Sequence, residues 1–130
     1  MKIAFATDNG ENYVDRHFGD AQYYDVYELL ESEHKFIKRI SNTTEEDDEE
    51  VHADPVKAKG VASLFKDEDI QVLVSKVFGP NIKRIKKKFV CVLMNDNTIK
   101  DSIEILQKKL NHLSIEWEKG KKRKHLNFKV

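Results

Sequence analysis

The stretch Val14-Asp15-Arg16-His17-Phe18-Gly19-Asp20-Ala21 separates the first two apolar runs of the chain. The run before it, Lys2 to Thr7, predicts a strand that ends in a turn at Asp8-Asn9-Gly10. The run after it, Tyr23 to Leu29, predicts a second strand. The stretch is therefore expected at the rim of a sheet, where loops gather and often bind ligands.

His17 is the main candidate ligand residue in this loop. Its imidazole could bind a metal or an anion, and Arg16 places a permanent charge beside the ring. Gly19 lacks a Cβ, so the backbone there could approach a ligand closely. The alternative is a histidine that is only solvated or caps a neighbouring element.

Composition limits the classes of function. The chain has 130 residues, enough for one domain with a real core, and 35% of them are charged. Its 23 basic and 23 acidic residues cancel, so the net charge gives no case for nucleic acid or an anionic membrane as the main partner. Two local runs stand out, acidic at residues 45–50 and basic at residues 119–124.

The single cysteine, Cys91, lies in an apolar run and is interpreted as a small buried hydrophobe. One thiol can form no disulfide within the chain and cannot supply the roughly four protein ligands of a conventional iron–sulfur cluster. No run approaches the ~18 apolar residues of a membrane span, and the chain opens directly into a strand. We therefore expect a cytoplasmic protein.

The first half continues with a hairpin. Lys35 to Ile40 predicts a strand antiparallel to Tyr23 to Leu29. Residues 42–51 are interpreted as a solvated acidic loop, with calcium or magnesium binding as the alternative, although the ligand spacing and glycine of an EF-hand are missing.

The second half alternates helices and strands. Proline and aspartate suit the first positions of a helix, so Asp54-Pro55 predicts a helix start, and Gly79-Pro80-Asn81 predicts another. The first helix is expected to bury a stripe formed by Ala58, Val61, Ala62, Leu64 and Phe65. Ile70 to Val74 and Phe89 to Met94 predict two parallel strands, one on each side of the second helix.

The C-terminal part begins with a capping box at Thr98-Ile99-Lys100-Asp101, followed by helical spacing of apolar residues as far as Leu110. Leu113, Ile115 and Trp117 alternate with polar residues and predict an edge strand, with a mobile basic tail after it. The result is an α/β fold with a mixed sheet of about five strands between helices. We assign residues 1–112 to the domain and residues 113–130 to the edge strand and tail.

Several segments occur in a characteristic order, namely Lys2-Ile3-Ala4-Phe5-Ala6-Thr7-Asp8, Val14, His17-Phe18-Gly19, Ala21, Tyr23, Tyr24, and Phe78-Gly79-Pro80-Asn81 before a helix. Together they resemble the dinitrogenase iron–molybdenum cofactor biosynthesis family over roughly Met1 to Leu110. The resemblance implies a three-layer α/β/α ribonuclease-H-like motif with strand order 3-2-1-4-5 and strand 2 antiparallel. It also implies that His17 helps to hold an iron–sulfur or iron–molybdenum cluster. Many relatives carry a glycine- and histidine-rich segment where this chain has only His52.

A carrier is the first functional hypothesis. His17 would be the donor, Arg16 and Lys76 would supply charge, and backbone N–H groups after Gly79 would face an anionic ligand. An ordinary helix start is the alternative for Gly79. The candidate ligand-binding residues are His17, Arg16, Gly19, Gly79 and Asn81, with His17 and His52 as candidate metal ligands.

Two other classes remain as alternatives. Ribonuclease-H-like nucleases hold two metal ions with several carboxylates. Asp8 is suitably placed for this, but the fourth strand ends without an acid and Glu28 is the only other candidate, so we expect no enzyme. The third class is a regulatory or adaptor module, in which the basic tail binds nucleic acid, a phosphate-rich ligand or the acidic loop of another copy in a weak dimer.

Overall fold

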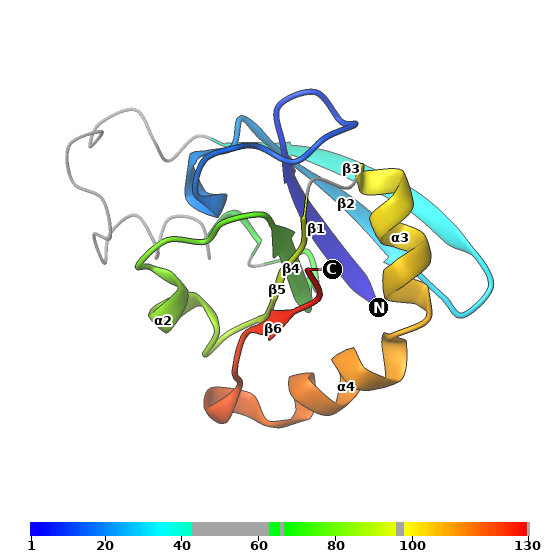
Figure 1. The fold of residues 1–130 in the computed structure, drawn as a ribbon, viewed down its shortest axis with the longest axis vertical. Coiled ribbons are helices and arrows are strands. Elements are labelled where there is room, and N and C mark those ends of the chain that lie inside the picture. The colour runs from blue at the N-terminus through cyan, green and yellow to red at the C-terminus, as the bar shows by residue number, and fades with distance from the viewer. Residues whose placement is uncertain (43–62, 66, 96–97, 130) are drawn as a thin grey trace.

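A mixed six-stranded sheet organises the computed structural model, which describes residues 1–42, 63–65, 67–95 and 98–129 (Figure 1). The strand order is β3-β2-β1-β4-β5-β6. The strands are β1 (Lys2–Thr7), β2 (Tyr23–Leu29), β3 (His34–Ser41), β4 (Val72–Ser75), β5 (Val90–Leu93) and β6 (Leu126–Asn127). The first five strands have the predicted order, with β2 antiparallel to both neighbours, and β6 is an addition.

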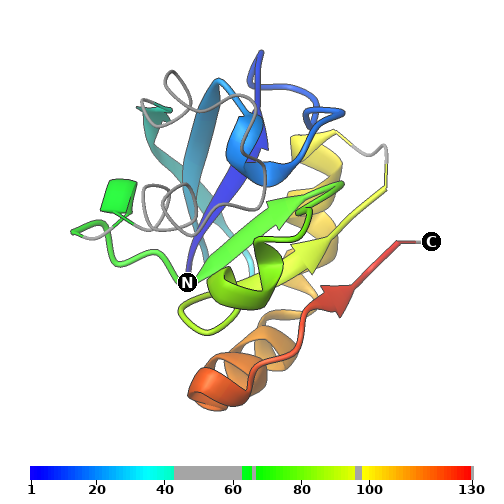
Figure 2. The ribbon, with the colours of Figure 1, turned by 90° about the vertical axis from the view of Figure 1, so that its left-hand side faces the viewer.

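The central strand β1 is buried on both faces because its alternate side chains enter two different cores. Ala4 and Ala6 pack into one apolar cluster, whereas Ile3 and Phe5 pack into the other. The short helix α2 (Ile82–Ile85) covers the first face, and α3 (Ile99–Gln107) and α4 (Leu110–Glu118) cover the second. Figure 2 shows α2 in front of the sheet and α3 behind it. The predicted arrangement of helices on both sides of a sheet is confirmed.

The strands β1, β4 and β5 run parallel to one another, so the loops that leave β1 and β4 lie at the same end of the sheet. β4 continues past Ser75 into a loop that ends at α2, and this loop lies beside the one that follows β1. Loops at the carboxyl ends of neighbouring parallel strands are the usual place for a binding site in α/β proteins. The topology therefore places His17 and Gly79 at the same end of the sheet.

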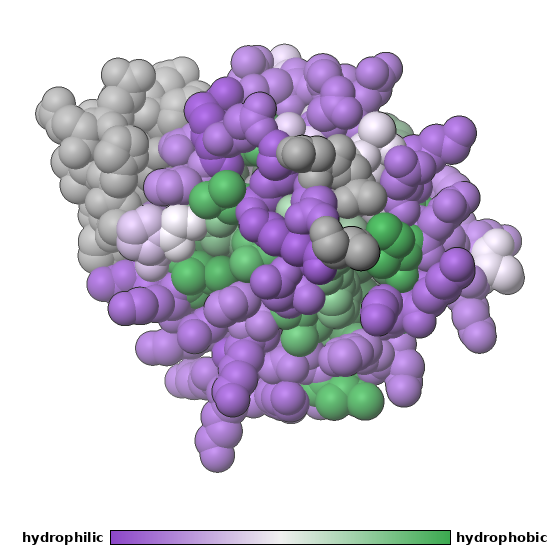
Figure 3. Space-filling model, in the orientation of Figure 1, coloured by the Kyte–Doolittle hydropathy of each residue, from purple (hydrophilic) through white to green (hydrophobic). Residues whose placement is uncertain are grey.

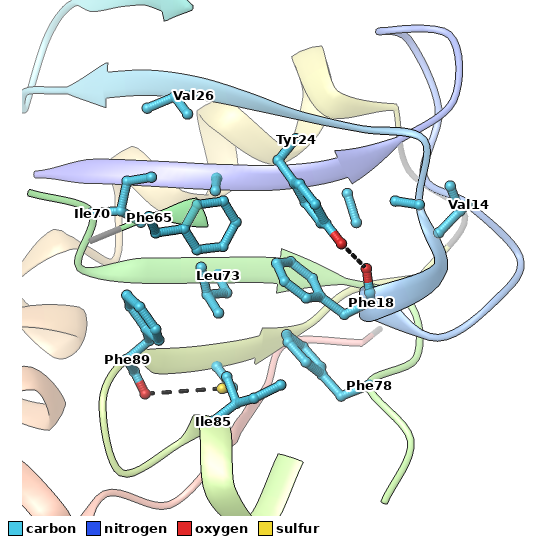
Figure 4. Packing of buried hydrophobic residues seen from close by; sticks show 14 residues of the cluster. Val14, Phe18, Tyr24, Val26, Phe65, Ile70, Leu73, Phe78, Ile85 and Phe89 are labelled. Carbon is cyan, nitrogen blue, oxygen red and sulfur yellow. Dashed lines mark hydrogen bonds between the residues drawn. The ribbon is translucent and has the colours of Figure 1, made fainter. Parts of the chain in front are cut away.

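Aromatic rings fill the core on the α2 face (Figure 4). Phe18 stacks on Phe78 with ring centroids 5.1 Å apart, and it also contacts Tyr24 at 4.8 Å. The buried Tyr24 hydroxyl donates a hydrogen bond of 2.8 Å to the carbonyl of Phe18. Because Phe18 follows His17 directly, these contacts fix the loop from beneath.

Of the capping box predicted at the start of α3, the hydrogen bond to the Thr98 side chain is confirmed. The Asp101 N–H donates to the Thr98 side-chain oxygen at 3.1 Å, which satisfies one of the N–H groups that have no partner within the helix. The apolar stripe of α3 packs on the second cluster. The helix ends at Gln107, however, and a second helix begins at Leu110.

The prediction of an edge strand over Leu113, Ile115 and Trp117 is wrong, because these residues lie in α4. In a strand the three side chains would share one face, but in a helix Leu113 and Trp117 share a face and Ile115 points away. The structure has the helical arrangement: Leu113 is fully buried, Trp117 packs beside it, and Ile115 is exposed.

The prediction of a mobile basic tail is also wrong for the described residues. Residues 120–122 form a turn of 3-10 helix, and β6 then pairs in parallel with β5. Arg123 is buried, with only 7% of its surface exposed, and it donates to the carbonyl of Trp117 at 2.9 Å and to that of Lys87 at 2.9 Å. Its guanidinium also stacks on the Trp117 ring at 4.3 Å. One arginine of the basic run thus holds the C-terminal segment on the domain.

Several sequence predictions lie outside the described residues. They are the helix start at Asp54-Pro55, the acidic loop and His52. Of the predicted helical stripe, Leu64 and Phe65 are described, and both pack on the first cluster. No helix in the described ranges is long and apolar enough to span a membrane.

Candidate functional site

The His17 loop is joined to the loop after β4 by backbone contacts. The Phe18 N–H donates to the Val77 carbonyl at 2.8 Å, and His17 forms an isolated parallel bridge with Val77. The stacked rings of Phe18 and Phe78 lie just below this junction (Figure 4). The two loops therefore form one surface, as the sequence prediction required.

The imidazole of His17 lies directly against Gly79. A Cβ added at Gly79 would be 2.5 Å from Nδ1, 2.7 Å from Cγ and 2.8 Å from Cε1 of the ring. These three distances are so similar that the methyl group would lie over the face of the imidazole, and only glycine leaves room for the ring. Gly79 also has a φ of +75°, a conformation that L side chains rarely adopt.

The position of the ring leaves its nitrogens available. The lone pair or N–H of each nitrogen lies in the plane of the ring, whereas Gly79 contacts its face. Neither nitrogen makes a hydrogen bond within the described part of the chain, and the side chain is partly exposed. Among the described residues, packing on Gly79 thus orients the His17 ring, and the ring can offer a nitrogen to a ligand.

Asn81 follows Gly79 by two residues and carries a second polar group. Its Oδ1 atom is buried and has no hydrogen-bond partner among the described residues. Asn81 precedes α2 but its side chain does not cap the helix. Since α2 has only four residues, its dipole adds little to the site, and a ligand would reach the buried Asn81 oxygen only after the side chains over it move.

Arg16 points away from His17 toward the end of β1. It donates to both carboxylate oxygens of Asp8, at 3.0 and 2.8 Å, and to the Asp20 carbonyl at 3.0 Å. Asp8 also accepts the Gln22 N–H at 2.8 Å. Arg16 therefore closes the loop by tying its two ends together.

The other cation beside His17, Lys76, forms an ion pair with Asp15. Hydrogen bonding to Lys76 and its charge lower the pKa of the exposed Asp15 carboxyl. The positive charges that flank His17 are thus each matched by a carboxylate, and the local field is more nearly neutral than the sequence prediction supposed.

Sequence analysis missed Asn42, which supports the loop from the end of β3. Its buried amide donates to the carbonyls of Gly19 and Ala21, both at 2.8 Å. Gly19 therefore helps to hold the loop through its backbone carbonyl, which accepts a hydrogen bond from Asn42. No local sequence signal indicates this role, because the partners are more than 20 residues apart and meet only after the hairpin forms.

The described residues supply few metal donors. No group of three histidine, cysteine, aspartate or glutamate side chains in these ranges is placed to hold a metal ion. Cys91 lies in β5 and is fully buried in the first apolar cluster, and burial raises the pKa of its thiol to about 12. Among the described residues, the site therefore offers one partly exposed imidazole, and the amide oxygen of Asn81 is buried.

Comparison with known proteins gives the class. The sequence model of the family described as "Dinitrogenase iron-molybdenum cofactor" matches residues 1–109, and the chain belongs to this family. The crystal structure of a "putative dinitrogenase" from Methanocaldococcus jannaschii is similar in fold, with a TM-score of 0.59 and 21% sequence identity. The similarity covers 83% of this chain and 88% of that one. No curated protein matches this sequence.

Proposed function

We propose that this protein is a carrier that binds an iron–sulfur or iron–molybdenum cluster as cargo, with an imidazole nitrogen of His17 as the protein donor. The observation that supports the proposal is the packing of the His17 ring on Gly79, which orients the ring and leaves both nitrogens without a partner in the described residues. Membership of a family related to the iron–molybdenum cofactor supports a cluster as the cargo.

The donor set fits a cluster at one coordination position. An imidazole nitrogen is a common metal ligand. A resident iron–sulfur cluster is usually held by about four protein ligands. A single protein donor therefore suits cargo that must later be released to another protein.

The proposal is for a binding protein without catalytic activity of its own. The nuclease alternative needs Asp8 and Glu28 in one site, but Lys2 pairs with Glu28 at the opposite end of β1 from Asp8. Glu28 accepts a hydrogen bond from the N-terminal amine at 2.5 Å, and Asp8 is engaged by Arg16. These separate partners argue against a shared two-metal site.

Anaerobic reconstitution with a preformed iron–sulfur cluster tests the proposal. After excess cluster is removed, iron and acid-labile sulfide should remain with the protein in a fixed ratio. Pulsed electron paramagnetic resonance of the paramagnetic cluster should then show coupling to an imidazole nitrogen, and the coupling should change on ¹⁵N-histidine labelling. A protein that keeps neither iron nor sulfide, or a cluster without nitrogen coupling, would contradict the proposal.

A further inference from the structure

Two basic segments that are distant in the sequence meet on one surface. The first is α2 with the turn after it, and the second is the 3-10 turn with its flanking residues after α4. Arg123 joins them, since its buried guanidinium binds the carbonyl of Lys87 at 2.9 Å. Both ribbon views place these segments side by side (Figures 1 and 2).

This basic surface carries nine cationic side chains, nearly all exposed. They are Lys83, Arg84, Lys86, Lys87, Lys88, Lys119, Lys121, Lys122 and Lys124. No acidic residue lies between Ile82 and Phe89. In the second segment Glu118 is exposed, and the buried Glu116 forms an ion pair with Lys119 at 3.0 Å, so Lys119 adds less to the surface charge than the other lysines. The part of the molecule over α2 and the 3-10 turn shows long hydrophilic side chains (Figure 3).

Because the cations are clustered on one surface, a polyanionic partner becomes plausible although the net charge of the chain is zero. A net charge of zero gave no case for a polyanionic partner, but the field near a surface depends on the charges close to it. The Debye length at physiological ionic strength is about 8 Å, so acids elsewhere on the molecule do little to cancel this surface. The second segment also lies beyond residues 1–109, the part that matches the family.

We propose that the basic surface of α2 and the 3-10 turn binds the phosphate backbone of a nucleic acid without sequence specificity. Lysine predominates there, and a lysine ammonium suits a phosphate as a point charge. Centres of protein–protein interfaces are instead rich in aromatic residues and arginine and poor in lysine. None of the exposed large hydrophobic residues lies in these two segments, and the Trp117 ring is covered by Arg123. These features favour nucleic acid over an acidic protein.

Fluorescence anisotropy with a labelled DNA duplex of mixed sequence tests this proposal on the full chain. At physiological salt the parent should bind with a Kd of about 10⁻⁴ to 10⁻⁶ M, the range of nonspecific complexes, and more tightly at low salt. If roughly four phosphates are neutralised, the slope of log K against log salt should be about −3.6, and binding should weaken roughly 150-fold between 50 and 200 mM salt.

Three matched variants locate the surface. The helix variant Lys83→Gln/Lys87→Gln/Lys88→Gln and the tail variant Lys121→Gln/Lys122→Gln/Lys124→Gln should each weaken binding about 10-fold or more and flatten the salt slope. The control Lys35→Gln/Lys100→Gln/Lys108→Gln removes the same charge from exposed positions elsewhere and should change affinity less than about 2-fold. Circular dichroism should be the same for all four proteins.

Three results would overturn the proposal. The parent could fail to bind the duplex at low salt, or the control could weaken binding as much as the other two variants, which would mean that no particular surface is used. Alternatively, poly-glutamate could bind more tightly than DNA, which would identify the surface as a dock for an acidic protein.

Discussion

The His17 loop and the C-terminal segment from Leu110 to Lys129 are both built from polar, charged stretches, yet they follow opposite rules. Residues that are close in sequence predict where the loop lies, through a strand end and a turn, although distant residues such as Phe78 and Asn42 then hold it in place. The C-terminal segment depends on contacts between distant residues, with Arg123 bound to Lys87 and β6 paired with β5. Local pattern was thus a good guide to the first region and a poor one to the second.

The difference teaches that a basic run need not be a solvated tail. Arg123 is surrounded by lysines in the sequence, but it alone is buried, because its planar guanidinium can bind two carbonyls and stack on Trp117 together. A lysine has only a point charge to offer and stays in water. The fixed and the exposed residues of one run therefore have separate roles.

The largest effect on stability should come from Arg123→Ala. The change removes hydrogen bonds to the Trp117 and Lys87 carbonyls and the packing of the side chain on Trp117, so we expect a loss of about 2–3 kcal/mol in the free energy of unfolding. Urea denaturation measures it. Lys121→Ala, an exposed neighbour, should stay within about 0.5 kcal/mol. Equal effects of the two variants on the free energy of unfolding would show that Arg123 does not hold the C-terminal segment on the domain.

Gly79→Ala should cost about 2 kcal/mol, and Gly120→Ala is its matched control. Both glycines have positive φ, +75° and +59°, so both substitutions strain the backbone by about 1 kcal/mol. At Gly79 the new methyl also meets the His17 ring, whereas at Gly120 it meets nothing within 4 Å. In a His17→Ala background the Gly79→Ala cost should therefore fall to that of Gly120→Ala. A cost that does not change would show that the ring does not lie on Gly79.

Glu116 should make the C-terminal segment sensitive to acid. Burial alone would raise the pKa of this carboxyl, but hydrogen bonds from the Lys124 N–H and from Lys119 outweigh burial and lower it. A lowered folded-state pKa gives stability that is present above the ordinary glutamate pKa and lost as pH falls through the folded value. Glu116→Gln should cost about 1 kcal/mol near pH 7, and the difference from the parent should shrink on acidification. Thermal unfolding between pH 7 and pH 3 checks this, and a difference that grows in acid would refute the assignment.

Much of the fold could be predicted from sequence because its signals are local. Alternating and apolar runs gave β1 to β5, and Thr98 with Asp101 gave the start of α3. The error at Leu113 to Trp117 arose because residues 113, 115 and 117 fit a strand period, while Leu110, Leu113 and Trp117 also fit a helix. Only packing against the second cluster decides between the two patterns.

The candidate site was predictable only in outline. Topology brings His17 to Gly79 because β1 and β4 are adjacent and parallel, and the resemblance supplied that order. The pairing of Arg16 with Asp8 and the support from Asn42 depend on where side chains turn after folding. Sequence spacing carries no information on those directions, so the predicted role of Arg16 in ligand binding has no support from its contacts.

The substitution His17→Ala should have the smallest effect on stability. It is also the most direct test of the claim that His17 is the donor to the cargo. A partly exposed side chain at the rim of the sheet contributes little to the core, so the free energy of unfolding of the cluster-free protein should change by no more than about 0.5 kcal/mol. Cluster affinity, measured by anaerobic titration, should fall by at least the ~10–100-fold typical of losing even a group that supports a metal ligand. His52→Ala, the other candidate metal ligand, should lose less. An affinity equal to that of the parent, or a His17→Ala protein that unfolds, would contradict the claim that His17 is the donor to the cargo.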